Sequence, residues 1–143
     1  MSREYLIRLP WPPAKSSPNG SQGDYRGKAR AGRDYKAECG WICKAQAVQP
    51  FGPSVGGVHV EVTFHPPTSR AYDLDNMLAR CKRGLDAVAE AIGVDDRDWI
   101  SVHLARGEKI KGGSVLVHVR PVEPDNWRSI GALASDMVKG CVS

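Results

Sequence analysis

Four aspartates and one lysine in the second half of the sequence have the types and spacing needed for metal-dependent chemistry on phosphates. Asp73 and Asp75 are separated by one residue, so in an extended chain both carboxylates point to the same side. Asp95 and Asp96 supply two more carboxylates farther along the chain. Mg²⁺ is typically held by one or two carboxylates together with water and substrate phosphate. The spacing therefore permits a Mg²⁺ site.

The same residues have simpler explanations. Asp is favoured at helix N-termini, where the helix dipole stabilises negative charge, so Asp73 and Asp75 could serve only as capping residues. Lys82 follows Asp75 by seven residues, about two helical turns, which places the two on one face. Lys82 could neutralise charge developing on a phosphorane or orient an attacking water, or could form a surface ion pair with Asp86. Spacing alone leaves these alternatives open.

A short basic segment precedes this acidic region and is a candidate DNA-binding surface. The chain carries 20 Lys and Arg against 16 Asp and Glu, a formal net charge of +4. Five of the basic residues fall close together: Arg26, Lys28, Arg30, Arg33 and Lys36. Such a cluster suits contacts to nucleic-acid phosphates. The alternative is a solvated, flexible loop.

The hydrophobic pattern predicts the elements that must position these residues. Strict alternation over 58–64 predicts a strand, and an apolar stripe at helical spacing predicts a helix over 76–92. Weaker patterns predict further strands at 5–9, 99–105 and 114–119, a helix at 34–48, and a long loop over 14–32. The last two strands are expected to form a hairpin around the turn Lys111-Gly112-Gly113.

This order of elements, β-α-β-α-β-β, predicts an α+β fold in which helices pack on one face of a small mixed β-sheet. We expect one domain over residues 1–122, followed by a C-terminal tail at 123–143 with a helical pattern at 127–138. No apolar run approaches the roughly 20 residues needed to span a bilayer. We therefore expect a cytoplasmic protein, with no membrane partner and with its cysteines reduced.

Several of these motifs, taken together and in this order, resemble the RusA family of Holliday junction resolvases over roughly residues 5–120. The motifs are Leu9-Pro10-Trp11-Pro12-Pro13, Asp73-Leu74-Asp75-Asn76, Lys82, Leu85-Asp86-Ala87 and Gly93-Val94-Asp95-Asp96. The resemblance implies a homodimeric crossover junction endodeoxyribonuclease for DNA recombination and repair. Such an enzyme uses Mg²⁺, for which Mn²⁺ can substitute, to nick two strands of four-way DNA junctions symmetrically.

The resemblance also implies roles for individual residues. Asp73, Asp75 and one of the paired aspartates, Asp96 in preference to Asp95, match the metal-binding acidic residues of the catalytic site. Lys82 matches the essential basic residue.

Lys82 also marks a departure from the family pattern. The lysine lies about one helical turn later here than in the family, and Arg80 or Arg83 would replace it if the helix were rotated. A misplaced lysine is one route to the main alternative, a non-catalytic DNA-binding dimer that binds junctions and leaves them intact. An RNA-directed or general structure-specific nuclease is a third reading, although the sequence has no aromatic RNA-binding motif in its favour.

Overall fold

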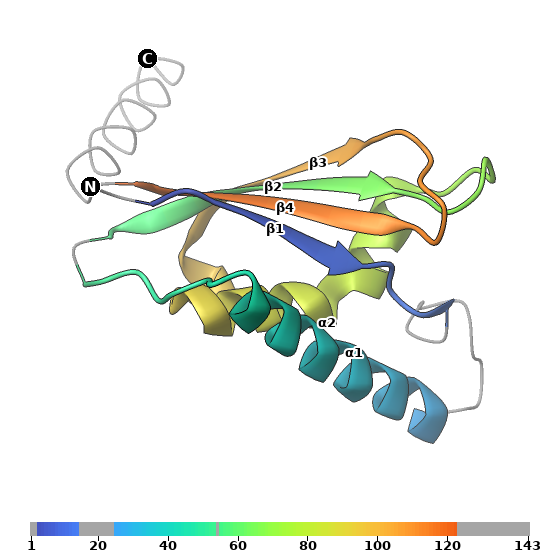
Figure 1. Ribbon diagram of the computed structural model, residues 1–143, viewed down its shortest axis with the longest axis horizontal. Coiled ribbons are helices and arrows are strands. Elements are labelled where there is room, and N and C mark those ends of the chain that lie inside the picture. The colour runs from blue at the N-terminus through green and yellow to red at the C-terminus, as the bar shows by residue number, and fades with distance from the viewer. Residues whose placement is uncertain (1–2, 15–24, 54, 123–143) are drawn as a thin grey trace, which may run out of the picture.

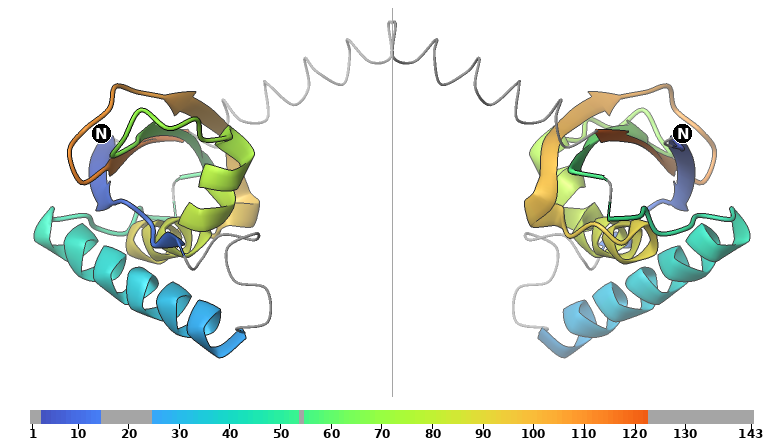
Figure 2. Two further views of the ribbon diagram at one scale, coloured as in Figure 1. Left: turned by 90° about the vertical axis from the view of Figure 1, so that its right-hand side faces the viewer. Right: turned by 90° about the vertical axis from the view of Figure 1, so that its left-hand side faces the viewer.

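A computed structural model describes residues 3–14, 25–53 and 55–122 of the chain. Both helices lie on the same side of a four-stranded sheet (Figure 1, Figure 2). The elements follow one another as β1 (Tyr5–Pro10), α1 (Tyr25–Ala45), β2 (Gly57–His65), α2 (Leu74–Ile92), the short 3₁₀ helix η2 (Asp96–Asp98), β3 (Trp99–Arg106) and β4 (Ser114–Val122). The predicted α+β class and the predicted order of strands and helices are confirmed. The helix expected at 127–138 lies outside the described residues.

The sheet is mixed, with strand order β1-β4-β2-β3. β2 pairs in parallel with β3, whereas β4 runs antiparallel to both β1 and β2. The hairpin predicted between β3 and β4 is therefore wrong, because β2 lies between them. The connection 107–113 instead crosses the end of β2. There the Gly107 amide donates a 2.8 Å hydrogen bond to the Phe64 carbonyl. Alternation identifies a strand but does not identify its neighbours.

The hydrophobic core lies between the helices and one face of the sheet. Alternate residues of β1, β2 and β4 point into it, and each is at most 1% exposed: Ile7, Leu9, Val58, Val60, Val62, Phe64, Val115, Val117 and Val119. From α2, the predicted stripe contributes Cys81, Leu85, Val88 and Ile92, with Met77 buried and Leu78 only partly buried. The stripe that predicted α2 is thus its core-facing side.

The first turns of α1 replace part of the predicted loop. The loop was expected to continue to Gly32, but the helix begins at Tyr25. No apolar pattern marks these turns, because this part of the helix packs through Gly32 against the side chain of Arg83 and needs no large apolar residue. Straight-chain basic residues and alanine are good helix formers even without such a pattern. The basic segment is consequently helical.

Two glycines within the helices provide a matched pair for testing how α1 and α2 pack. A Cβ atom at Gly84 of α2 would lie 2.8 Å from the Tyr35 ring, which is fixed by a 2.7 Å hydrogen bond from its hydroxyl to the Pro10 carbonyl. A Cβ atom at Gly40 of α1 would meet nothing within 4 Å. Close packing at one glycine contrasts with open space at the other.

We expect Gly84→Ala to lower the free energy of unfolding, because overpacking costs about 1–3 kcal/mol and the gain in helix propensity is about 1 kcal/mol. Gly40→Ala should raise it by about 0.5–1 kcal/mol. Urea unfolding of both variants beside the parent protein measures the difference. Equal effects of the two substitutions would contradict this description of the helix interface.

Candidate functional site

Trp11, in the proline-rich segment after β1, packs against the segment that leads into α2. Its ring makes edge contacts with Phe64, at 6.5 Å between centroids, and with Tyr72, at 5.5 Å. The Arg80 guanidinium lies 5.8 Å from the Trp11 ring centroid and donates a 2.9 Å hydrogen bond to the Pro12 carbonyl. These contacts join two motifs that are distant in sequence. They fix Tyr72, the residue immediately before Asp73.

The turn before β4 closes around the same tryptophan. Gly113 has a φ of +75°, and a Cβ atom there would lie 2.7 Å from Trp11. Glycine is required on both counts, since other residues are strained at positive φ and would also displace the ring. From the end of β3, the Arg106 guanidinium donates a hydrogen bond to the Tyr72 carbonyl. Trp11 and Arg106 therefore hold Tyr72 directly, and the turn at Gly113 packs against Trp11.

Asp73 and Asp75 lie exposed at this start. Asp73 occupies the N-cap position with extended backbone, but its side chain makes no capping hydrogen bond. Asp75 lies in the first turn, where its Oδ1 accepts a 3.0 Å hydrogen bond from the Asn76 amide. Asp73 therefore occupies the capping position, but its carboxylate does not form the hydrogen bond of a cap. Two carboxylates remain accessible to a ligand at the positive end of the helix dipole.

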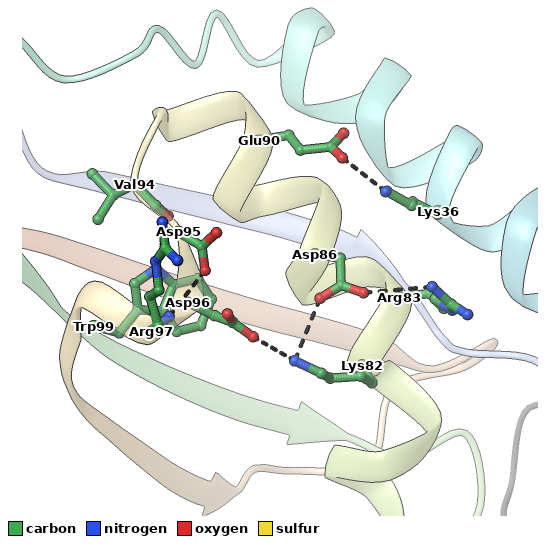
Figure 3. Close-up of polar contacts among 10 residues, drawn as sticks. All are labelled: Lys36, Lys82, Arg83, Asp86, Glu90, Val94, Asp95, Asp96, Arg97 and Trp99. Atoms are coloured by element: carbon green, nitrogen blue, oxygen red, sulfur yellow. Dashed lines mark hydrogen bonds and ion pairs between the residues drawn. The ribbon is translucent and has the colours of Figure 1, made fainter.

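Lys82 projects from the exposed side of α2 and bridges two carboxylates (Figure 3). Its Nζ lies 2.5 Å from Asp96 Oδ2 and 3.4 Å from Asp86 Oδ1, and Arg83 reaches Asp86 at 3.9 Å. The predicted pair with Asp86 is confirmed, and the stronger contact, to Asp96, joins the turn after α2 back to the helix. Helix geometry places Lys82 about 10 Å along the axis from Asp75.

This ion pair shifts the titration of both partners. The hydrogen bond from Lys82 is the largest cause that lowers the pKa of Asp96, and a contact with Asp95 lowers it further. The hydrogen bond to Asp96 is likewise the largest cause that raises the pKa of Lys82. Lys82 therefore stays protonated at neutral pH, so it can stabilise negative charge but cannot act as a general base there.

The pair should consequently persist across a wide pH window. Its contribution to stability is lost as pH falls through the lowered pKa of Asp96, and also as pH rises through the raised pKa of Lys82. We expect an NMR titration of the Asp96 carboxyl to give a pKa below its ordinary value, and Lys82→Met to raise that pKa. An Asp96 pKa that does not respond to Lys82→Met would show that the contact is absent in solution.

Asp95 has a different role from Asp96. Its Oδ1 accepts a 3.1 Å hydrogen bond from the Arg97 amide and so caps η2. The Trp99 indole donates a 3.1 Å hydrogen bond to the Val94 carbonyl, which anchors the same turn (Figure 3). The geometry thus distinguishes the two paired aspartates. Asp95 is occupied in shaping the turn, whereas Asp96 faces Lys82.

A hollow of about 370 Å³ lies beside this turn, between α2 and α1. Carboxylates of Asp86, Glu90, Asp95 and Asp96 line it, and Lys36 of α1 reaches it through a 2.7 Å ion pair with Glu90. One residue of the predicted DNA-binding cluster is thereby brought to the predicted acidic site. Glu90 was missed by the sequence reasoning, although it follows Asp86 by four residues and so lies beside it on the helix surface.

The other four predicted DNA-binding residues follow one another along the first half of α1. Arg26, Lys28, Arg30 and Arg33 are all exposed, whereas Lys36 is half-buried. Their placement on a helix makes the cluster an ordered surface. The alternative of a flexible loop does not describe it.

The predicted metal site of Asp73, Asp75 and Asp96 stays a prediction. Within the part of the chain that the structure describes, no three His, Cys, Asp or Glu side chains gather closely enough to hold a metal ion. Asp96 is paired with Lys82, and Asp95 caps η2. Asp73 and Asp75 still fit a site of the two-carboxylate kind that Mg²⁺ accepts.

Comparison with known proteins identifies a relative of this chain. No protein-family model matches the sequence. Among the helices that the structure describes, none is long and apolar enough to cross a membrane. An "Uncharacterized protein" of Xylella fastidiosa (strain Temecula1) is 34% identical over 119 residues, which cover 79% of this chain and 74% of the relative. The chain therefore belongs to the same family as this Xylella fastidiosa protein.

Proposed function

We propose that this protein is a Mg²⁺-dependent, RusA-like endonuclease that resolves Holliday junctions and other branched DNA during recombination and repair. The observation that carries the proposal is the convergence of motifs at the start of α2. The proline-rich segment packs through Trp11 onto the residue before Asp73, and α2 then carries Asp75 and Lys82 on exposed positions. The proline-rich motif and the motif Asp73-Leu74-Asp75-Asn76, far apart in sequence, thus lie next to each other.

The proposed division of labour follows from the geometry. Asp73 and Asp75 would hold Mg²⁺, which supplies positive charge for the scissile phosphate and lowers the pKa of a water molecule. Lys82, kept protonated by Asp96, would stabilise the charge that develops on the phosphate oxygens. Asp96 acts as a positioning residue for Lys82. The basic residues of α1 would contact phosphates away from the scissile bond.

The assembly and location follow from the proposed reaction. Nicking two strands symmetrically requires two equivalent sites, and the described residues of one chain supply one proposed site, so we propose a homodimer with two-fold symmetry. We also propose a cytoplasmic location, where a bacterial enzyme would meet its DNA substrate.

The test is to incubate the purified protein with a labelled four-way junction and a linear duplex of matched sequence, each with Mg²⁺, Mn²⁺ or EDTA. Symmetric nicking of the junction alone, lost in EDTA, is the expected result. Cleavage of duplex and junction at equal rates would contradict the junction specificity. Absence of cleavage under every condition would contradict the nuclease proposal.

One observation favours a second candidate, the non-catalytic DNA-binding dimer. Asp96, one of the predicted metal ligands, is paired with Lys82 at 2.5 Å. Such a protein would bind the four-way junction in the same assay and leave both strands intact. Junction binding without cleavage, in the presence of Mg²⁺ or Mn²⁺, would therefore support this candidate over the nuclease.

A further inference from the structure

The indole of Trp41 is exposed on the outer side of α1. With 71% of its surface open to solvent, it exceeds the other exposed large hydrophobic residues described, of which Leu6 is next at 63%. Neighbouring Cys43 is fully buried, so the helix packs through a different side. A large aromatic ring that contributes little to the core is a common feature of binding surfaces.

Trp41 continues the row of basic residues on α1. Successive positions separated by three or four residues share one helix face. They form a stripe, called here the α1 stripe, made of Arg26, Arg30, Arg33, Ala37, Trp41 and Lys44. From its first to its last residue the stripe is roughly 27 Å long. Asp34 and Glu38 lie along one flank, so the positive charge is concentrated in the stripe itself.

The end of the stripe combines positive charge with the aromatic ring. Lys44 Nζ lies 5.1 Å from the centroid of the Trp41 ring, within the range of a cation–π contact. The exposed fraction of Trp41 shows that Lys44 covers only part of the indole. A charged groove or stripe with an accessible aromatic platform is the arrangement by which proteins bind unpaired nucleic-acid strands.

We propose that the α1 stripe binds an unpaired DNA strand, with a base stacked on Trp41 and phosphates contacted by its arginines and Lys44. The proposal rests on the proposed function and deepens it, since branched DNA such as a flap or a fork carries unpaired strand beside the branch point. Fully paired duplex offers no free base face for stacking. A second copy of the chain is a poorer occupant, because a two-fold contact through this stripe would place four positive charges against four.

The test measures binding in EDTA, by fluorescence anisotropy of a labelled oligothymidylate and of an abasic oligonucleotide of the same length. Trp41→Ala should weaken binding to the oligothymidylate by about tenfold, as expected for loss of one stacked base, and leave binding to the abasic strand unchanged. Trp41→Phe should recover most of the affinity. Leu6→Ala removes a similarly exposed apolar side chain from β1 and should change neither affinity.

Three outcomes would overturn the inference. Trp41→Ala could bind the oligothymidylate as tightly as the parent, or lose affinity equally for both strands, which would indicate a charge or folding effect. The variant could instead change the sedimentation coefficient of the DNA-free protein, which would assign Trp41 to a contact between copies. Because these measurements need no Mg²⁺ and no cleavage, they fail independently of the junction assay that tests the nuclease proposal.

Discussion

Asp75→Asn is expected to slow Mg²⁺-dependent cleavage of a four-way junction by at least about 100-fold. Asparagine keeps the shape of the side chain and removes the charge, and metal binding through carboxylates contributes several kcal/mol to charge stabilisation at a phosphate. Asp75 is exposed and its hydrogen bond to the next amide is local, so the fold should be unaffected. Single-turnover cleavage rates at saturating protein measure the effect on the reaction itself.

Asp73→Asn should behave in the same way, since Asp73 uses no capping hydrogen bond that the substitution would disturb. Glu38→Gln, which neutralises an exposed carboxylate on α1, is the matched control and should retain cleavage. Retained cleavage in both aspartate variants, with the junction bound normally, would remove the metal site from the start of α2.

Trp11→Ala is expected to lower the free energy of unfolding by about 3 kcal/mol, the lower end of the range for large aromatic residues, because the ring is only partly buried. The substitution removes the contacts to Phe64 and Tyr72 and leaves open the space in which Gly113 approaches the ring. Thermal unfolding followed by circular dichroism measures the loss.

Cleavage should fall as well, even well below the melting temperature, because Trp11 holds the residue before Asp73. Trp41→Ala is the matched control for stability: the same substitution at an exposed position should change the free energy of unfolding by no more than about 0.5 kcal/mol. Trp11→Phe should recover part of both properties. Normal cleavage by a stably folded Trp11→Ala protein would show that the tryptophan does not position the site.

Local patterns in the sequence predicted the elements better than their neighbours in space. The alternation in β2 and the stripe in α2 record which side chains meet the core, and both elements lie within a few residues of their predicted bounds. No local hydrophobic pattern in the sequence shows which strands pair with each other. The parallel contact of β2 with β3 depends on the crossover through α2, and the predicted β3–β4 hairpin failed for that reason.

The candidate site was predictable as a set of residues and not as an arrangement. Helical spacing correctly placed Lys82 beside Asp86, since both lie on one helix. The closer partner of Lys82 is Asp96, and this contact depends on the path of the chain after Gly93, whose positive φ ends α2. The contact of Trp11 with Tyr72 joins segments far apart in sequence. No periodic pattern encodes either contact.

The strand order also constrains when the chain can fold during its synthesis. Of the described strands, β1 is synthesised first and its partner β4 is synthesised last, so Tyr5 cannot pair until Val119 has been made. β4 also lies between β1 and β2, so these strands cannot join into one sheet until β4 has been synthesised. Contacts of such long sequence separation slow folding and prolong the exposure of unpaired apolar strands. A nascent chain that stops before Ser114 would hold both helices but no continuous sheet for them to cover.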